Sequence, residues 1–463
     1  MDPDPANSQE SSHLETIWTV HVEVRLSAKS KRRFDTIKSQ VKGWLQSLEC
    51  LSIPSDLHGW EQDPSLASCV ERIAVAESPC PSSILPLSQI SLNIHTYQPI
   101  ESDSVDEYTN GNDSGEGEGV LAASVCELPS TSLEGLWDGL IYSDNIKLRL
   151  LDYIHATLIL SDLNVDSNLV SWNRVVLLHG PPGTGKTSLC RALAQKLSIR
   201  MSHRYSQSRL LEINSHSLFS RWFSESGKLV QRLFNNINEM IEDEDCFVVV
   251  LIDEVESLTA ARAGAMAGTE PSDGLRVVNA LLTQLDKLRQ KKNVLVMSTS
   301  NLAKAIDSAF VDRADIVQYV DLPPREAIYE ILRSSICEFV DKKLIQEAVV
   351  PPLNEALFYE DTGNYAQQND GSPVSTAPHT ERVKLGRSLL TLSARCRELG
   401  LSGRALRRLP VLALARYIGL GVSSRNGILD NDSGNFHTDI YTWLDAMGKV
   451  LDERASTHGQ LLQ

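Results

Sequence analysis

The sequence lacks the features that direct a chain into membranes, disulfide frameworks or nucleic-acid complexes. No run approaches about 18 apolar residues, and the polar segment 1–15 has no apolar core of a secretion signal, so we expect neither membrane insertion nor secretion. The eight cysteines form no C-x-x-C pair, which predicts reduced structural thiols of an intracellular protein. With 44 basic against 60 acidic residues, and no basic run interleaved with aromatics, we expect no direct nucleic-acid binding.

The 463 residues are enough for two or three domains. Residues 19–26 alternate apolar and polar side chains, and residues 31–48 have the pattern of an amphipathic helix, so residues 1–98 are expected to form a small α+β domain. From Glu101 to Gly119 there are seven acids and no Lys or Arg. Because that composition cannot bury much apolar area, residues 99–132 are predicted to be a disordered acidic linker.

Apolar strands and helical patterns alternate over residues 133–322. The apolar runs are residues 175–178, 247–252 and 294–297, and this alternation predicts a parallel sheet with helices on both faces, an α/β fold. Residues 323–463 are rich in helical patterns and are expected to form a helical lid. A polar segment, 354–382, is predicted to interrupt that lid as a loose insertion.

A glycine-rich stretch after the first apolar run has the order strand, loop, helix that is typical of phosphate-binding loops. Its glycines allow backbone N–H groups to converge on one anion, while Lys186 reaches the outer phosphates and Thr187 offers a hydroxyl to Mg²⁺. The alternative is a glycine-rich turn that ends in Lys-Thr by chance. The predicted nucleotide-binding residues are Gly180, Pro181, Pro182, Gly183, Thr184, Gly185, Lys186, Thr187 and Ser188.

Two further predicted strands end in polar side chains. Asp253 and Glu254 follow the wholly apolar run 247–252, and Asn301 follows the run 294–297. Carboxyl ends of parallel strands are where α/β sheets bind ligands, so we predict that Asp253 holds Mg²⁺ and Glu254 takes a proton from the attacking water. Asn301 is either a simple turn former or a residue that orients this water or touches the γ-phosphate.

Together with the run 276–286, these motifs resemble an AAA+ ATPase module. The segments 214–228, 267–273 and 310–316 are similar, more narrowly, to the pachytene checkpoint protein 2 (thyroid hormone receptor interactor 13) family. The likeness is dense over about 135–323, recurs at 400–410 and is faint before residue 120. It implies an AAA+ module with a helical lid, a small N-terminal domain that binds substrate or adaptor, and a homo-hexamer with ATP and Mg²⁺ as cofactors.

The resemblance also implies roles for individual residues. Arg313 would be the arginine finger for the neighbouring subunit's γ-phosphate, or else an ordinary ion pair with Asp312 or Asp315. Arg404, in the first turn of a lid helix, would sense the γ-phosphate, or else be a surface charge. Trp222 and Phe223 would grip a peptide in a central pore, or else pack beneath their own helix. Residues similar to those that pack on adenine in relatives are Leu136, Leu140, Ile141 and Tyr142, and the alternative is that they only dock the linker.

By the same resemblance, the partners are HORMA-domain proteins, engaged directly or through an adaptor, in meiotic chromosome-axis control and the spindle checkpoint. The expected location is the nucleus and the chromosome, with the cytoplasm as a further one. A nucleotide-gated scaffold without unfolding activity is the alternative function, which Glu254 argues against because a pure switch has no need of a base. A nucleic-acid motor is disfavoured by the net charge of −16.

Overall fold

The computed structural model describes most of the chain, and every structural statement below refers to that part. The described residues are 17–101, 106–107, 123–142, 144–163, 165–166, 169–215, 226–257, 273–289, 291–302, 306, 308–366, 377–419 and 438–461. Trp222 and Phe223, the predicted pore residues, lie outside these ranges.

The N-terminal domain is built on a four-stranded sheet in the order β3-β4-β1-β6. Strand β1 (Trp18–Leu26) pairs in parallel with β6 (Ile90–Tyr97) and antiparallel with β4 (Val70–Val75), beside β3 (Ser55–Leu57). Every second residue of β1 is buried, as the alternation predicted. Helix α1 (Phe34–Leu45) covers this apolar face, while β2 (Cys50–Ser52) and β5 (Ile84–Pro86) form a small second sheet. The predicted α+β domain is confirmed.

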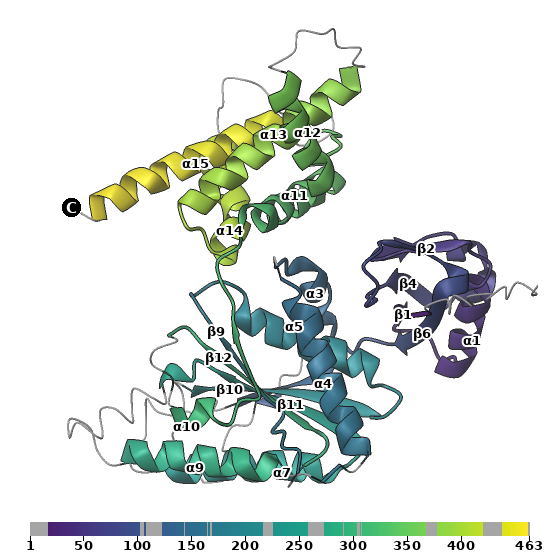
Figure 1. Cartoon of the computed structure of the whole chain (residues 1–463), viewed down its shortest axis with the longest axis vertical. Helices are drawn as coiled ribbons and strands as arrows, with labels where there is room; N and C mark the ends of the chain where they lie inside the picture. Colours follow the sequence, from purple (N-terminus) through teal and green to yellow (C-terminus); the bar gives the residue numbers. More distant parts are fainter. Residues whose placement is uncertain are drawn as a thin grey trace, which may run out of the picture.

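The central domain is an α/β sandwich around a seven-stranded sheet of order β13-β9-β12-β11-β10-β8-β7. Five adjacent strands are parallel: β13 (Ile316–Tyr319), β9 (Val175–His179), β12 (Val294–Ser300), β11 (Cys246–Asp253) and β10 (Gln207–Asn214). One face packs against α4 (Ile146–Asp162) and α5 (Lys186–Arg200), the other against α7 (Ser226–Glu242) and α9 (Asp273–Leu288) (Figure 1). Coverage on both faces explains why residues 247–252 of β11 are all apolar.

Part of the expected disordered linker is ordered in the structure. Residues Ala123–Leu128 form β8, which pairs antiparallel with β10, and Asp106–Glu107 form the short β7 beside it. Ala123, Val125 and Leu128 are buried, so this strand has an apolar face that the acidic residues before it conceal in the sequence. The prediction of disorder over 99–132 is therefore wrong for 123–132, and the central sheet begins before residue 133.

The C-terminal lid is an all-helical domain with its own core. It contains α11 (Arg325–Asp341), α12 (Leu353–Ala366), α13 (Ala377–Glu398), α14 (Gly403–Ala413) and α15 (Ile440–Leu461), with a π-helical turn at Leu414–Ile418. Helices α12 and α13 include residues 354–366 and 377–382, so the predicted loose insertion is wrong for these residues, and the rest of that prediction, 367–376, lies outside the described ranges. Buried residues of both helices, among them Ala356, Leu385 and Leu389, join the lid core.

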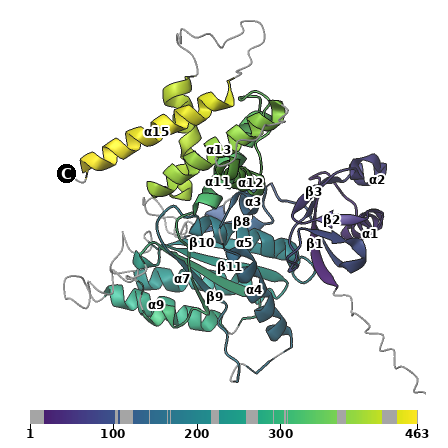
Figure 2. The same cartoon turned by 45° about the horizontal axis from the view of Figure 1, so that its top comes forward.

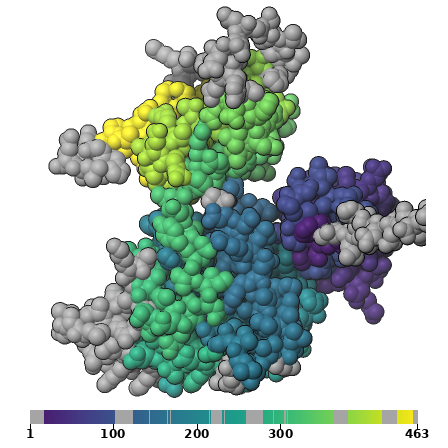
Figure 3. Space-filling model, in the orientation of Figure 1, coloured from purple at the N-terminus to yellow at the C-terminus, as the bar shows by residue number. Residues whose placement is uncertain are grey.

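The lid contacts the phosphate-binding loop at the carboxyl ends of the central strands, whereas the N-terminal domain contacts the far end of α5. The lid stands above the central domain (Figure 3), and the N-terminal domain lies at the side of the central domain, near α5 (Figure 2). None of the described helices combines the length and apolar character needed to cross a bilayer. The phosphate-binding loop, between β9 and α5, lies where the central domain faces the lid.

Candidate nucleotide-binding and catalytic site

The glycine-rich loop has a backbone that few other residues could adopt. Gly180 and Gly183 have φ angles of 144° and 78°, a region that side chains with a Cβ rarely enter. A Cβ at Gly180 would lie 2.2 Å from the carbonyl oxygen of Val320, and one at Gly183 would lie 2.7 Å from Oγ of Ser402. Both positions therefore require glycine for their backbone conformation. Glycine also allows Gly180 to lie close to the end of β13 and Gly183 to lie close to the lid.

Lys186 begins α5 and its side chain folds back into the loop. Only 5 % of Lys186 is exposed, and its Nζ donates hydrogen bonds to the carbonyl oxygens of Gly180 (2.8 Å) and Pro181 (2.7 Å). Burial lowers the pKa of Lys186, and nearby Arg404 adds to this lowering, while Glu256 and Asp253 oppose it. The ammonium is thus held inside the loop at a helix N-terminus, a position suited to phosphate.

Asp253 accepts hydrogen bonds from three hydroxyl groups. Its Oδ1 accepts a hydrogen bond from Thr187 Oγ1 at 2.9 Å and another from Thr299 Oγ1 of β12. Ser215, just after β10, donates to the backbone carbonyl of Asp253. A hydroxyl and a carboxylate side by side are hard oxygen ligands, and Mg²⁺ commonly uses one or two such groups together with substrate phosphates. The donor set at Thr187 and Asp253 fits Mg²⁺.

Glu254 has an unusual backbone at the end of β11. Its φ is +57°, in the left-handed region that non-glycine residues seldom occupy, and its N–H donates to Thr299 Oγ1 at 3.3 Å. Such backbone strain costs on the order of 1 to 3 kcal/mol and persists where surrounding contacts impose it. The residue is exposed, so its carboxylate has access to water. This arrangement suits the predicted role as a general base.

Asn301 follows β12 and is held by a residue outside the set predicted from the motifs. Oε1 of Glu256 accepts a hydrogen bond from the backbone N–H of Asn301 at 3.1 Å. The other carboxylate oxygen, Oε2, is buried without a hydrogen-bond partner among the described residues. Glu256 is also the acidic group that most favours the charged form of Lys186. The sequence reasoning did not single out Glu256. The signal that could have identified it is its place as the third acid in Asp253-Glu254-Val255-Glu256.

The lid touches the phosphate-binding loop through the start of α14. Ser402 caps this helix by accepting from the backbone N–H of Ala405 at 3.4 Å, and the backbone N–H of Arg404 donates to the carbonyl of Gly183 at 3.1 Å. Arg407 donates to the carbonyl of Gly139. Arg407 lines the same cavity as Arg404.

A cavity of about 480 Å³ lies between the central domain and the lid, beside the loop. The four residues proposed to pack on adenine all line it, and Tyr142 Oη also donates to the carbonyl of Gly185 at 3.3 Å. Apolar side chains from the end of β13, the connection to the lid and α11 complete the wall, a composition that suits a planar base. The lining includes Leu136, Leu140, Ile141, Tyr142, Thr184, Ser188, Val320, Leu322, Ile331, Arg404 and Arg407.

Arg313 does not line this cavity. It follows α10 (Ser308–Val311) and forms an ion pair with Asp286 of α9, rather than with Asp312 or Asp315 as the alternative suggested. Asp315 instead accepts hydrogen bonds from Tyr153 Oη and from the backbone N–H of Asn173. The structure therefore brings together the loop, Asp253, Glu254, Asn301 and Arg404, and leaves Arg313 on another part of the domain.

Comparison with known proteins covers the whole of this architecture. Residues 15–102 match the family model of the TRIP13 N-terminal domain, residues 176–322 that of the ATPase family associated with various cellular activities (AAA), and residues 324–430 that of the TRIP13-like AAA+ ATPase lid C-terminal domain. Pachytene checkpoint protein 2 homologs from Danio rerio, Xenopus tropicalis and Homo sapiens are 44%, 45% and 43% identical, each over 86% of this chain and 88% of the relative.

A solved structure supports the same assignment. The structure of C. elegans PCH-2 is 33% identical, with a TM-score of 0.67, and the match covers 95% of this chain and 99% of that chain. The likeness therefore extends over the N-terminal domain, the central sheet and the lid, including the faint region before residue 120.

Proposed function

Because this chain belongs to the pachytene checkpoint protein 2 family of AAA+ ATPases and hydrolyses ATP, we propose that it uses hydrolysis to remodel HORMA-domain proteins. The observation that carries this proposal is the N-terminal domain of residues 15–102, which matches a domain model specific to this family and is joined to the ATPase module. A domain reserved for one family points to that family's clients or adaptors, whereas the AAA module alone is common to many functions.

The proposed chemistry assigns each side chain one task. The loop N–H groups and Lys186 bind the phosphates, and Thr187 with Asp253 holds Mg²⁺, which neutralises phosphate charge when bound. Glu254 accepts a proton from the attacking water, and Asn301 orients that water or the γ-phosphate. Arg404 senses the γ-phosphate and links the position of the lid to it. The hydrogen bond from the backbone N–H of Arg404 to the carbonyl of Gly183 supports this role.

Assembly supplies the rest of the proposed machine. In a homo-hexamer, Arg313 reaches the nucleotide of the next subunit, and Trp222 with Phe223 grips the client in the central pore. The clients are HORMA-domain proteins of meiotic chromosome axes and of the spindle checkpoint, in the nucleus and on chromosomes, with a further pool in the cytoplasm. An adaptor that binds the N-terminal domain is the expected route for clients that are not engaged directly.

Capture of the client tests the proposal. The Glu254→Gln variant keeps an amide in place of the base, so it is expected to bind ATP without splitting it and to retain bound client. Pull-down in ATP followed by mass spectrometry should recover a HORMA-domain protein. The control is the double variant with Lys186→Ala, which should recover none because it cannot hold ATP. Recovery of no HORMA protein with the single variant, while ATP remains bound, would contradict the proposal.

A further inference from the structure

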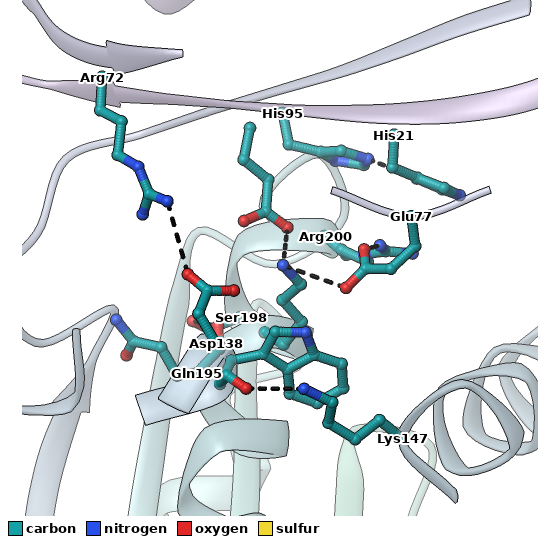
Figure 4. A network of polar contacts seen from close by, with 12 residues as sticks. His21, Arg72, Glu77, His95, Asp138, Lys147, Gln195, Ser198 and Arg200 are labelled. Atoms are coloured by element: carbon teal, nitrogen blue, oxygen red, sulfur yellow. Dashed lines mark hydrogen bonds and ion pairs between the residues drawn. The ribbon is translucent and has the colours of Figure 1, made fainter. Parts of the chain in front are cut away.

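The helix that begins at the phosphate-binding loop ends against the N-terminal domain. Helix α5 starts with Lys186, and two cations near its other end, Lys196 and Arg200, pair with Glu23 of β1 and with Glu77, which follows β4. Figure 4 shows Arg200 beside Glu77. Lys196 Nζ lies 2.6 Å from Oε1 of Glu23 and 3.3 Å from Oε1 of Glu77, and Arg200 pairs with the other oxygen of Glu77. One rigid element therefore joins the nucleotide site to the N-terminal domain.

These four charges are buried, which sets them apart from other ion pairs at the same interface. Their side chains are 7 to 15 % exposed. Those of Arg25 and Glu134, 2.8 Å apart, are 30 % and 24 % exposed, and those of Arg72 and Asp138, 3.5 Å apart, are 43 % and 61 % exposed. Burial raises the pKa of Glu77, but Lys196 and Arg200 outweigh burial and the net pKa is lowered. Removal of one partner from a buried pair is strongly destabilising, while an exposed pair contributes little. Removal of one charge from the buried cluster should therefore cost more than removal of a charge from the more exposed pairs.

A second set of contacts leads from the cluster to the nucleotide cavity. Two lysine side chains contact the Trp137 ring: Lys196 Nζ lies 5.4 Å from its centroid and Lys147 Nζ lies 4.9 Å from it. Lys147 also donates to the carbonyls of Trp137 (2.8 Å) and Leu140 (2.9 Å), and Leu140 lines the cavity. The segment around Trp137 therefore contacts Lys196 of the cluster through its ring and reaches the nucleotide cavity through Leu140.

The segment before Trp137 is tied to the same helix. The side chain of Gln195 accepts from the backbone N–H of Ser130 at 2.9 Å and donates to the carbonyl of Ser130 at 3.0 Å. Gln195 precedes Lys196 directly, so α5 holds both the segment that leads to Trp137 and the N-terminal domain itself. Any shift of α5 with nucleotide moves both attachments together.

We propose that Glu23, Glu77, Lys196 and Arg200 form an ion latch that positions the N-terminal domain on α5 and couples its docking to nucleotide binding. The proposed coupling goes beyond the remodelling of HORMA-domain proteins. It requires that a nucleotide binds at the phosphate-binding loop, but it does not require any particular client protein. Linkage makes the coupling reciprocal: if docking strengthens nucleotide binding, nucleotide strengthens docking by the same factor. Residues Lys196 and Arg200 are positioning residues that act through the helix and Trp137.

The test uses the full chain, with ADP as the probe so that turnover does not interfere. Glu77→Arg places three cations together and should raise hydrogen exchange in β6 and in the C-terminal half of α5. It should also weaken ADP binding by about fivefold or more, at the lower end of measured allosteric couplings. The swapped variant Glu77→Arg/Arg200→Glu should restore both quantities to within about twofold of the wild type, since opposite charges again face each other.

The matched control is Arg72→Glu, which reverses an exposed charge on the N-terminal-domain side of the same interface and should change neither quantity. Glu77→Gln, a nearly isosteric change, keeps the test valid if the reversal fails to fold, and should shift both quantities in the same direction. Unchanged exchange in both Glu77 variants, raised exchange with unchanged ADP affinity, or no rescue in the swapped variant would each overturn the latch. If the pull-down with Glu254→Gln recovers no HORMA-domain protein, these outcomes keep their meaning, because they depend only on ADP binding and hydrogen exchange.

Discussion

Arg313 and Asp286 form a two-point ion pair in which Nε and Nη2 lie 2.8 and 2.9 Å from the two carboxylate oxygens. Nη1 of Arg313 also donates to the carbonyl of Ala309 at 2.6 Å. A planar guanidinium suits such a carboxylate as well as it suits a phosphate. If Arg313 serves the neighbouring subunit's nucleotide, Asp286 holds it within its own subunit and must be exchanged for the γ-phosphate.

Mixing two inactive variants tests whether Arg313 acts in trans. Arg313→Ala lacks the finger but keeps Glu254, whereas Glu254→Gln lacks the base but keeps the finger. In a ring with head-to-tail contacts, equal mixing should give a complete site at about a quarter of the interfaces, so phosphate release should reappear. A mixture as inactive as its two components would show that Arg313 serves only its own subunit. Asp286→Asn, which weakens the resting ion pair, should retain turnover.

Glu256 should influence turnover through Asn301. Glu256→Ala removes the acceptor from the backbone N–H of Asn301, and an unpaired buried group costs about 1 to 3 kcal/mol. If this loosens Asn301, turnover falls by about tenfold, which corresponds to about 1.4 kcal/mol. Glu256→Gln keeps an acceptor oxygen and should recover part of the loss.

Steady-state phosphate release and ADP affinity, measured together, identify the cause. A positioning role predicts non-additive effects with Asn301→Ala, because Glu256 would act through the side chain of Asn301 and its loss should matter little once that side chain is gone. Glu244→Ala, on an exposed surface, is the control and should behave as the wild type. Equal and independent losses from Glu256→Ala and Asn301→Ala would argue that the two residues act separately.

Local sequence patterns predict the strands and the phosphate-binding loop because their causes are local. The uninterrupted apolar run in β11 follows from burial on both faces, and the glycines follow from the loop's positive φ angles. These features require no knowledge of a distant partner. The order of elements was therefore enough to place Lys186, Asp253 and Asn301 at the same edge of the sheet.

Long-range partners decided the features that the sequence did not reveal. The strand β8 is short and follows an acidic segment, and its place is set by pairing with β10, about 80 residues away. Glu256 and Arg407 resemble ordinary surface charges until the fold brings them to Asn301 and Gly139. The pairing of Glu77 with Arg200 likewise joins two domains, and no spacing rule connects these positions.

The aromatic pair Trp222 and Phe223 stays a prediction from the sequence. Trp222→Ala is expected to leave ATP turnover within about twofold, since the ring belongs to the proposed pore rather than to the nucleotide site, while client remodelling is lost. Trp222→Phe keeps an apolar ring and should retain most remodelling. Turnover and remodelling should be measured on the same preparation. Unfolding of Trp222→Ala would instead favour packing under its own helix.

Two stacked histidines lie at the interface between the N-terminal domain and α5. They should make the free energy of unfolding depend on pH. His21 and His95 lie 5.3 Å apart between ring centroids and share a hydrogen bond of 3.0 Å, which requires one ring nitrogen to accept. Burial, reinforced by Arg200, lowers the pKa of His21 to about 4 and that of His95 to about 3. Other charged or titratable groups that act on the pair are Glu77, Lys196, Lys38, His155 and His203.

The sign follows from proton linkage. Between the ordinary histidine pKa of 6.5 and these lowered values, the unfolded chain binds protons that the folded chain does not, so stability falls as pH falls through this window. At pH 5 each histidine should cost on the order of 2 kcal/mol relative to pH 7.5. The pKa of Glu77 is lowered from 4.5, so loss of its contribution begins only below that pH.

Urea unfolding followed by tryptophan fluorescence at pH 7.5 and pH 5 measures this loss. His21→Asn combined with His95→Asn removes both titrating rings, so the difference between the two pH values should shrink by most of the histidine contribution. His58→Asn is the control, because the side chain of His58 is 83 % exposed and should leave the pH dependence unchanged. Equal pH dependence in the double variant and the wild type would show that other groups cause the loss, since the two rings would then titrate alike in the folded and unfolded chains.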